Sequence, residues 1–455
     1  MPRSVPLWVF LLFVLFSVCF LVIFSWAVRS TVQGSNVSGS FGRAAVSIAA
    51  FPNTAKTAIT ELIDLAGGTP EANTLVVPRD NGIDLSGFGP VGTSEPGLLP
   101  GVLIKADQNR MTQGWRFVLG AFDLDGEIEN AGVLLSPDLK VVKTWILDEI
   151  AIEGLKPRAK YRKFVHGFEL LPDGSLIFSF DGGVSLQRFD SCGARQWATA
   201  GKFHHAVSLG DNKQTLWTLK DRDILQVAVE DGAILKEIRM GAVIAQNPMI
   251  DILEIRRVHP NDETGNTRNT RAPWMNDPFH FNDVDPLPAQ IADRFPDFEA
   301  GDLLISARSL NLVFVMDPET LKIKWWRSGA TKRQHDPDWR ASGDISILNN
   351  RMNRDFSEIV LIDPGNFRTS QAFSGQMNNF YTRIRGKHQW LDDGTLIISS
   401  PQQGRIFEVG VDGEVVFELA NTNPDNEAEN LVVSEMKWMP PDFFDLEKWT
   451  CPIND

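Results

Sequence analysis

Several chemically informative residue types are scarce in this sequence. Its 455 residues include only three cysteines, two tyrosines and seven histidines, and 44 Lys and Arg face 58 Asp and Glu. The resulting net charge of −14 argues against nucleic acid as a partner, because phosphate binding normally takes a basic patch. The cysteines, Cys19, Cys192 and Cys451, form neither a disulfide framework nor a metal-ligand pattern. A bridge between Cys192 and Cys451 in an oxidising compartment stays open as an alternative.

Aromatic strand formers, in contrast, are plentiful. Thirteen Trp and twenty-nine Phe predict many packed aromatic strands. The length suffices for one large core or for two or three domains.

The first 29 residues form a targeting element. Leu7 to Val28 contains no charge and is mostly Leu, Val, Phe and Ile. At about 1.5 Å per residue, a helix of this length spans the ~30 Å hydrocarbon core of a bilayer. Cleaved signals usually have shorter apolar regions, although the small residues Ser25 and Ala27 leave cleavage open. We therefore expect residues 1–29 to be a single membrane anchor or uncleaved signal, with the large domain exported to the periplasm or another extracytoplasmic space.

Residues 30–112 are predicted to be a linker and an irregular stalk. Ser30 to Ser40 is rich in Ser and Gly, and a short helix is expected from Thr54 to Leu65. Thr69 to Gly101 is rich in Gly and Pro and has no sustained hydrophobic period. No chemistry is apparent in this region.

From residue 113 the sequence repeats. Six units of uneven length contain short strands of Val, Ile, Leu, Phe and Trp, divided by turns such as Asp173-Gly174 and Asp393-Gly394. Three or four strands per unit of roughly 35–50 residues predict an all-β, six-bladed β-propeller rather than a pair of β-sandwiches. The propeller is expected over residues 113–440, followed by a C-terminal tail at 441–455.

Five of the seven histidines recur at one place in their units. Each begins the first strand, which is commonly the innermost strand of a propeller blade, so its start lies at one mouth of the central channel. These histidines are His166, His205, His280, His335 and His388. His204 would need a one-residue slip, which turns side chains to the opposite face, and is expected to point elsewhere. His259 fits no repeat phase and is expected at the surface.

A second group of side chains is predicted at the same mouth. The second strand of a blade runs antiparallel to the first, so its end returns beside the start of the first. Asp181, Lys220, Arg308 and Asn350 occupy this returning position in four units. Imidazoles with a guanidinium, an ammonium and few acids indicate an anion site. Structural, hydrogen-bonded histidines are the alternative, for His166 and His388 above all.

A metal centre is not predicted at this mouth. Neutral imidazole is a common metal ligand, but no HxH or HExxH spacing occurs and Arg308 would repel a cation.

Four stretches resemble the bacterial arylsulfate sulfotransferases, over about residues 164–419. They are HGFELLPDGSLIFSF followed by RFDSCGARQW, the His204-His205 doublet, HFNDVDPL followed by ISARSLNLVFVMD, and RQHDPDWRASGDISILNN. The resemblance implies a six-bladed propeller that uses no nucleotide sulfate donor and no other cofactor.

The resemblance also implies roles for individual residues. His335, in the QHD motif, looks like the residue that accepts the sulfuryl group covalently. His280, Asn282 and Arg308 look like binders of the sulfuryl oxygens, and Asn350 joins the substrate-binding candidates. His205 looks like a further binder or a proton donor. The remaining candidates are His204, His166, His388 and Lys220.

We therefore expect an enzyme that transfers a sulfuryl group from a phenolic sulfate ester to a phenol through a sulfohistidine. Imidazole, with a pKa near 6.5, is largely neutral at pH 7 and can both attack and leave. One alternative is a non-catalytic exported propeller that binds an anionic ligand or a protein partner through the same face. A metal-dependent hydrolase or lyase is another. The expected partners are an aryl sulfate, a phenol and the membrane; the oligomeric state, a homo-oligomer included, stays open.

Overall fold

The computed structural model describes residues 6–32, 40–41, 44–45, 48, 75–79, 83–92, 98–157, 163–255 and 277–451. The chain divides into two compact units, Met1–Pro70 and Glu71–Asp455. The short helix expected from Thr54 to Leu65 and the side chain of His259 lie outside the described residues.

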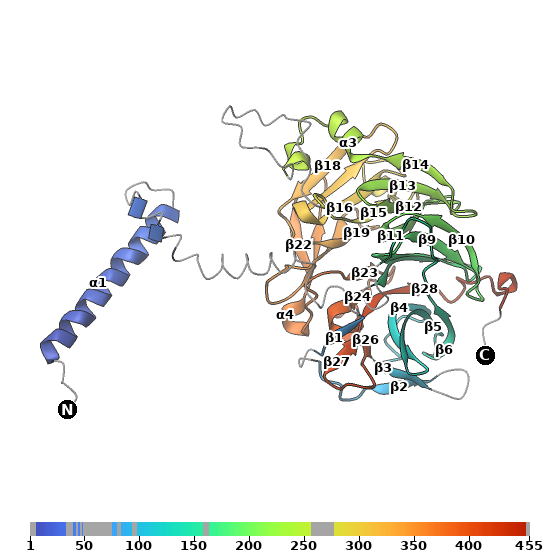
Figure 1. Cartoon of the computed structure of the whole chain (residues 1–455), viewed down its shortest axis with the longest axis horizontal. Helices are drawn as coiled ribbons and strands as arrows, with labels where there is room; N and C mark the ends of the chain where they lie inside the picture. Colours follow the sequence, from blue (N-terminus) through green and yellow to red (C-terminus); the bar gives the residue numbers. More distant parts are fainter. Residues whose placement is uncertain are drawn as a thin grey trace. The chain divides into compact units, whose positions relative to one another are not determined.

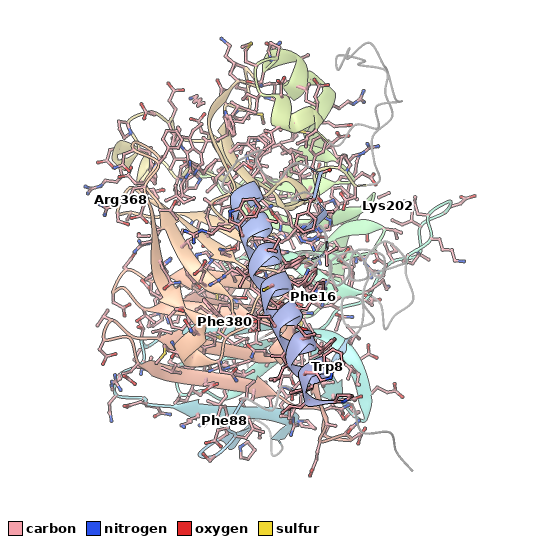
Figure 2. The ribbon with its side chains drawn as sticks, turned by 90° about the vertical axis from the view of Figure 1, so that its left-hand side faces the viewer. Trp8, Phe16, Phe88, Lys202, Arg368 and Phe380 are labelled. Carbon is pink, nitrogen blue, oxygen red and sulfur yellow. A yellow bond between two sulfur atoms is a disulfide. The ribbon has the colours of Figure 1, made fainter. Side chains whose placement is uncertain are left out.

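The first unit contains one long apolar helix, α1 (Leu7–Val32). Its large side chains are mostly exposed, and Trp8 and Phe16 on this helix are labelled in Figure 2. By length and composition, Leu7–Arg29 is the one candidate membrane span among the described residues. A helix of this kind at the N-terminus fits a membrane span or a signal sequence.

The second unit contains the predicted six-bladed β-propeller (Figure 1). Four blades each consist of four consecutive antiparallel strands. The second blade contains β7 (Phe164–Leu170), β8 (Leu176–Asp181), β9 (Ser185–Phe189) and β10 (Arg195–Ala200). The third contains β11 (Phe203–Leu209), β12 (Thr215–Lys220), β13 (Asp223–Ala228) and β14 (Ile234–Ile238). The fourth contains β15 (Phe281–Pro286), β16 (Leu303–Ala307), β17 (Leu312–Met316) and β18 (Ile323–Ser328). The fifth contains β19 (His335–Trp339), β20 (Ile345–Asn349), β21 (Glu358–Ile362) and β22 (Thr369–Ser374).

The other two blades combine strands from distant parts of the chain. The first contains β28 (Val433–Met439), β4 (Trp115–Leu124), β5 (Glu127–Leu135) and β6 (Val141–Ile146). The sixth contains β23 (Lys387–Trp390), β24 (Leu396–Ser400), β25 (Arg405–Val409) and β26 (Val415–Asn421). Beside β26, the sixth blade is extended by β3 (Leu98–Ala106) and β2 (Gly89–Gly92), and β1 (Val76–Pro78) pairs with β27 (Glu429–Leu431). The described part of the region predicted to be irregular thus contributes three strands.

Short helical segments lie between some of the strands, and one lies in the tail after β28. They are α3 (Met240–Gln246), α4 (Gly375–Asn378), η4 (Asp251–Glu254), η5 (Ala292–Arg294), η6 (Arg308–Leu310), η7 (Pro401–Gln403) and η8 (Leu446–Lys448). Of these, η6 begins at a residue that the sequence assigns to the site.

The innermost strands form a closed ring around the channel. In order they are β28, β7, β11, β15, β19 and β23, and each contacts the next. Along the chain the first blade starts with the segment from Trp115, but the C-terminal strand β28 is its innermost strand, with Met439 opposite Trp115. The last strand of the chain therefore closes the ring.

Apolar layers between neighbouring blades form the core. Strand β16 is buried at all five positions, because both faces of a blade pack against other blades. Between the first and second blades, the ring of Phe117 lies 5.1 Å from that of Phe168. Between the first and sixth blades lies a buried ion pair, Arg116–Glu408, whose side chains are both 0 % exposed.

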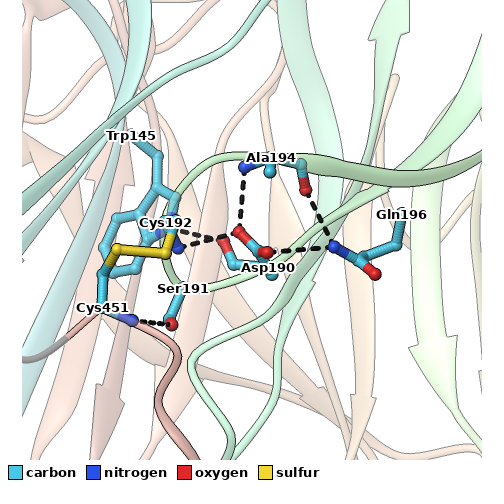
Figure 3. Close-up of a disulfide and its surroundings, with 7 residues drawn as sticks. All are labelled: Trp145, Asp190, Ser191, Cys192, Ala194, Gln196 and Cys451. Carbon is cyan, nitrogen blue, oxygen red and sulfur yellow. Dashed lines mark hydrogen bonds between the residues drawn. A yellow bond between two sulfur atoms is a disulfide. The ribbon is translucent and has the colours of Figure 1, made fainter.

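The tail after β28 is fixed to the second blade. A disulfide joins Cys192 to Cys451, with Cα atoms 5.0 Å apart (Figure 3). Nearby, the Trp449 indole N–H donates to the carbonyl of Pro172 at 3.2 Å. The bridge that the sequence left open is therefore present in the fold, and it secures the segment that follows the ring-closing strand.

Candidate functional site

Five innermost strands bulge near their starts: β28, whose register shifts between Val433 and Glu435, and four strands that contain or follow a candidate histidine. In those four strands the register shifts between Val165 and Phe168, His204 and Val207, Phe281 and Asp283, and His335 and Pro337. Three bulges contain a residue with positive φ, namely Gly167, His205 and Asp336 at 95°, 66° and 55°. A bulge re-aims side chains because it interrupts the alternation of a strand. Histidines from neighbouring blades can therefore turn toward one mouth.

His205 is the centre of a cluster of imidazole rings. Its ring centroid lies 4.2 Å from that of His166, 4.8 Å from that of His204 and 5.3 Å from that of His280. His204 was expected to point away, but its Nδ1 lies 2.8 Å from Nδ1 of His205. The expectation was wrong because the bulge at His205 breaks the alternation on which it rested.

His335 is nearly inaccessible and is held by two hydrogen bonds. It is 2 % exposed, its Nδ1 lies 2.6 Å from Oδ1 of Asn350, and its Nε2 accepts the backbone N–H of Arg385 at 3.2 Å. Since Nε2 accepts, Nδ1 carries the proton of the neutral ring and donates it to Asn350. The lone pair of this imidazole is therefore on Nε2.

Asn350 orients that ring. Its Nδ2 donates to the carbonyls of Thr382 and Arg385, at 2.9 and 2.6 Å, so its Oδ1 is the atom that faces His335. The side chain is fully buried and contacts the histidine. Its geometry is that of a residue that positions His335, whereas the sequence placed it among the substrate binders.

Asn282 has a similar supporting place one blade earlier. It is fully buried and its Nδ2 donates to the carbonyl of Gln334, the residue before His335. The Gln334 amide in turn donates to Ser306 and to the carbonyl of Leu312, both at 3.1 Å. The HxN and QHD motifs are thus joined by hydrogen bonds that fix the start of β19.

Arg308 lies close to both His280 and His335. Its backbone N–H donates to the carbonyl of His280 at 3.1 Å, and its side chain is half-buried at the start of η6. Burial, followed by the charge of Arg308, lowers the pKa of His280 and holds the pKa of His335 well below its usual range. Burial and the neighbouring His166 do the same to the pKa of His205. These imidazoles are neutral at pH 7 and face a permanent cation.

A cavity opens at this mouth, and a smaller cavity lies beside other residues of the inner strands. The cavity at the mouth has a volume of about 940 Å³, and its lining includes His204, His205, His280, Asp277 and Asp181. Among the described residues, His335 and Arg308 are outside the lining of both cavities. Lys220 is outside them too. It lies opposite Phe203 in the sheet, and its side chain packs so closely on Gly201 that a Cβ added to this glycine would lie 2.8 Å from the Lys220 Cδ.

Asp277 holds His280 through two hydrogen bonds. The ring Nδ1 of His280 bonds a carboxylate oxygen of Asp277, and the backbone N–H of His280 donates to the other oxygen at 3.1 Å. Burial raises the pKa of Asp277, but the hydrogen bond and charge of His280 outweigh this effect and hold that pKa at about 2.

The structure does not place His388 in this cluster. It lies opposite Ile398, two residues into β24, which is the register of Pro337 in the fifth blade rather than that of His335. Its Nδ1 bonds Asp336 at 2.8 Å and its Nε2 bonds Ser346 at 2.5 Å. The shared phase expected for His388 is wrong because β23 lacks the bulge of the other strands.

The second cavity, of about 440 Å³, is lined by acids of the inner strands. Lys387 lies between two of them, with its Nζ 2.7 Å from both Asp283 and Asp336. Burial raises the pKa of Asp283 to about 6 and that of Glu435 to about 8. Asp336, Asp338 and His388 lie close enough together to hold a cation, but the Lys387 ammonium already neutralises Asp336.

Sequence reasoning missed several residues of the two sites. Asp277, Arg385, Asp336 and Lys387 were not candidates. Asp277 could have been found from its spacing, three residues before His280, and Asp336 follows His335 directly in the chain. Arg385 had no such signal, because the loop before β23 brings it to His335 from 50 residues away.

The comparisons with known proteins agree with the motifs. A family model described as arylsulfotransferase (ASST) matches residues 167–422, more than half of the chain. No curated protein matches.

Three solved structures are similar to this chain at low identity. A Bacteroides caccae protein of unknown function is 11% identical over 72% of this chain and 99% of its own, with a TM-score of 0.47. A streptogramin B lyase is 12% identical over 82% and 100%, with a TM-score of 0.40. Virginiamycin B lyase from Staphylococcus aureus is 10% identical over 61% and 84%, with a TM-score of 0.35. Similarity at this level carries no argument about function.

Proposed function

The chain belongs to the arylsulfotransferase family, and on this premise we propose that it moves a sulfuryl group from a phenolic sulfate ester to a phenol through His335. The observation that carries the proposal is the pair of hydrogen bonds on the His335 ring. The Asn350 oxygen accepts a hydrogen bond from the Nδ1–H of His335. The lone pair of the ring is therefore on Nε2, the atom that must attack sulfur. Burial and Arg308 lower the pKa of His335, which keeps that lone pair unprotonated at pH 7.

In the first half-reaction, the Nε2 lone pair of His335 forms a bond to sulfur. The bond from sulfur to the phenolic oxygen breaks, and its electron pair leaves on that oxygen. To attack, Nε2 must give up the Arg385 N–H, which at 3.2 Å is a long hydrogen bond. That N–H is then available to a sulfuryl oxygen.

In the second half-reaction, the acceptor phenol gives its O–H proton to a neighbouring imidazole, its oxygen attacks the sulfur, and the bond from sulfur to Nε2 breaks. The electron pair returns to Nε2, and the ring leaves as neutral imidazole because Nδ1 kept its proton. Asn350 suits this role better than a carboxylate would. An amide oxygen accepts the Nδ1 proton without stabilising a charged ring as strongly as a carboxylate does.

The sulfuryl oxygens are assigned to cationic and N–H groups around His335. Arg308 supplies a permanent charge, and fixed donors of this kind stabilise the charge that develops in the transition state. His205 completes the group, with Asn282 fixing the strand that presents His335.

We also propose that the propeller is exported and anchored by α1. The apolar span Leu7–Arg29 supports the anchor, and the Cys192–Cys451 bridge supports an oxidising compartment. Protease added to spheroplasts of an expressing bacterium should degrade the propeller. A propeller that is digested only after lysis would contradict export.

The test of the reaction is a burst experiment on the purified full chain. Without an acceptor, 4-nitrophenyl sulfate should release one nitrophenolate per enzyme molecule, and His335→Ala should abolish this burst. Arg308→Ala should slow it by about 10²–10³-fold. Mass spectrometry of digests kept from acid should find the sulfuryl group on His335. A burst in His335→Ala, or a sulfated residue other than His335, would overturn the assignment; an anion that binds without any burst would favour the non-catalytic propeller.

A further inference from the structure

We propose that Asp277 is the residue that positions His280 as the acid–base group of the transfer, so that the phenolic proton passes through Nε2 of His280. This inference rests on the proposed function and deepens it. The sequence resemblance instead suggests His205 as the proton donor and His280 as an oxygen binder.

The contacts of Asp277 fix the tautomer of His280. One carboxylate oxygen accepts the backbone N–H of His280 and the other bonds its ring Nδ1. A carboxylate with a pKa of about 2 is ionised at neutral pH and only accepts hydrogen bonds. Nδ1 of His280 must therefore carry a proton, which leaves the lone pair of the neutral ring on Nε2. A histidine oriented by a third group in this way is the usual arrangement of a general base.

Among the residues that the structure describes, no carboxylate bonds the ring of His205 in this way. Its Nδ1 faces Nδ1 of His204, whose Nε2 donates to the carbonyl of Asp221 at 3.0 Å. His205 is thus bonded to another imidazole, and its other near neighbours are His166 and His280. Burial and these imidazoles hold the pKa of His205 well below its usual range, so a proton is poorly retained there.

The charges around His280 allow it to take and return a proton. Arg308 opposes protonation from one side, while Asp277 on the same loop and Asp181 at the end of β8 favour it. His205 and His204 approach from β11, and the pKa of His335 in β19 is lowered by His280 in return. A base balanced between a guanidinium and two carboxylates can cycle between its two forms, as general acid–base catalysis requires.

The position of His280 in the cavity fits contact with a phenol rather than with the sulfuryl group. His280 and Asp277 line the cavity of about 940 Å³, whereas His335 is outside its lining. A phenol in this cavity can place its hydroxyl at His280. The O–H bond then breaks, the proton goes to Nε2 of His280, and the oxygen electron pair forms the new bond to sulfur. In the first half-reaction of the next turnover the same proton goes to the departing phenolate, so the cycle is balanced without a co-reactant.

The experiment compares the two half-reactions in the full chain carrying Asp277→Asn. Release of 4-nitrophenolate needs no proton donor, so the rate of its burst should stay within about threefold of the wild-type rate. Transfer to unsubstituted phenol should fall by about 10²–10⁴-fold, the usual contribution of general acid–base catalysis. The loss should shrink steadily as the acceptor phenol becomes more acidic, and Asp277→Glu should restore part of the rate.

A matched control separates positioning from simple charge removal. Asp181→Asn removes one negative charge from the same cavity but leaves the Nδ1 partner of His280 in place. Its effect should not depend on the acidity of the acceptor. An equal loss in both half-reactions of Asp277→Asn, or a loss independent of acceptor acidity, would overturn the inference.

A measurement that needs no turnover tests the inference even if the proposed reaction does not occur. Nitrogen-15 NMR of histidine-labelled protein, assigned with His280→Gln, should find Nδ1 protonated in wild type and lose this state in Asp277→Asn. A wild-type His280 protonated on Nε2 overturns the inference whatever the activity. A correct tautomer without any burst from the wild type would instead overturn the sulfuryl-transfer reaction, and the role of His280 with it.

Discussion

Removing Glu408 should be among the most destabilising single substitutions in the propeller. Glu408 in β25 binds Arg116 in β4 through two hydrogen bonds, of 2.6 Å to Nε and 2.9 Å to a terminal nitrogen. Both side chains are 0 % exposed. The guanidinium also donates to the carbonyls of Gly114 and Thr112, so it cannot turn toward solvent when its partner is lost.

The magnitude follows from burial. Glu408→Ala leaves a charged guanidinium in the interface between the first and sixth blades, and breaking a buried pair in this way costs about 3–5 kcal/mol. For a protein of this size, each kcal/mol corresponds to roughly 2 °C, so the thermal midpoint should fall by about 5–10 °C at a fixed heating rate. Replacing both partners, Arg116→Met with Glu408→Leu, should cost less than Glu408→Ala, because no charge remains buried.

The control is a second ion pair between the same two regions. Arg110 and Asp412 also bond each other, but their side chains are 42 % and 54 % exposed. Asp412→Ala should therefore change the stability by no more than about 1 kcal/mol. Circular dichroism or differential scanning fluorimetry measures all the variants. A thermal midpoint for Glu408→Ala within 2 °C of the Asp412→Ala value would refute the reasoning, on the scale of about 2 °C per kcal/mol used above.

Three further predictions concern the disulfide, the acidic channel and His388. Cys192→Ser should lower stability by about 2–5 kcal/mol, whereas Cys19→Ser should not, and equal thermal midpoints would show that the bridge does not hold the tail. Burial raises the pKa of Glu435 from 4.5 to about 8, so the folded state retains a proton that the unfolded chain releases, and stability should fall as pH rises from about 4.5 to about 8. Glu435→Gln should flatten this fall in pH-dependent denaturation, and an unchanged slope would assign it to other channel acids. His388→Ala should lower the thermal midpoint, because it removes a hydrogen-bond partner of both Asp336 and Ser346. The variant should still give a full-sized burst of nitrophenolate. Loss of the burst with unchanged stability would instead place His388 in the reaction.

The amino-acid sequence determined the architecture. Repeated strands and Asp-Gly turns are local signals, and a period of roughly 35–50 residues has few solutions other than a propeller. The uncharged span near the N-terminus is equally local, because its length and composition alone give a helix able to cross a bilayer. The motifs around His280, Arg308 and His335 led to the prediction that these residues lie at the same mouth of the channel, since an antiparallel strand returns beside its neighbour.

Only the tertiary structure decided how each side chain is used. A bulge of a residue or two turns His204 toward the mouth, and its absence from β23 leaves His388 in the other cavity; nothing in a repeat period reports such a shift. One partner of the His335 ring, the backbone N–H of Arg385, comes from a segment 50 residues away. The pairing of Cys192 with Cys451, 259 residues apart, likewise depends on where the last strand closes the ring. Local sequence patterns determine the strands of each blade, whereas strand register and the packing between blades determine which ring nitrogen of each histidine carries the proton.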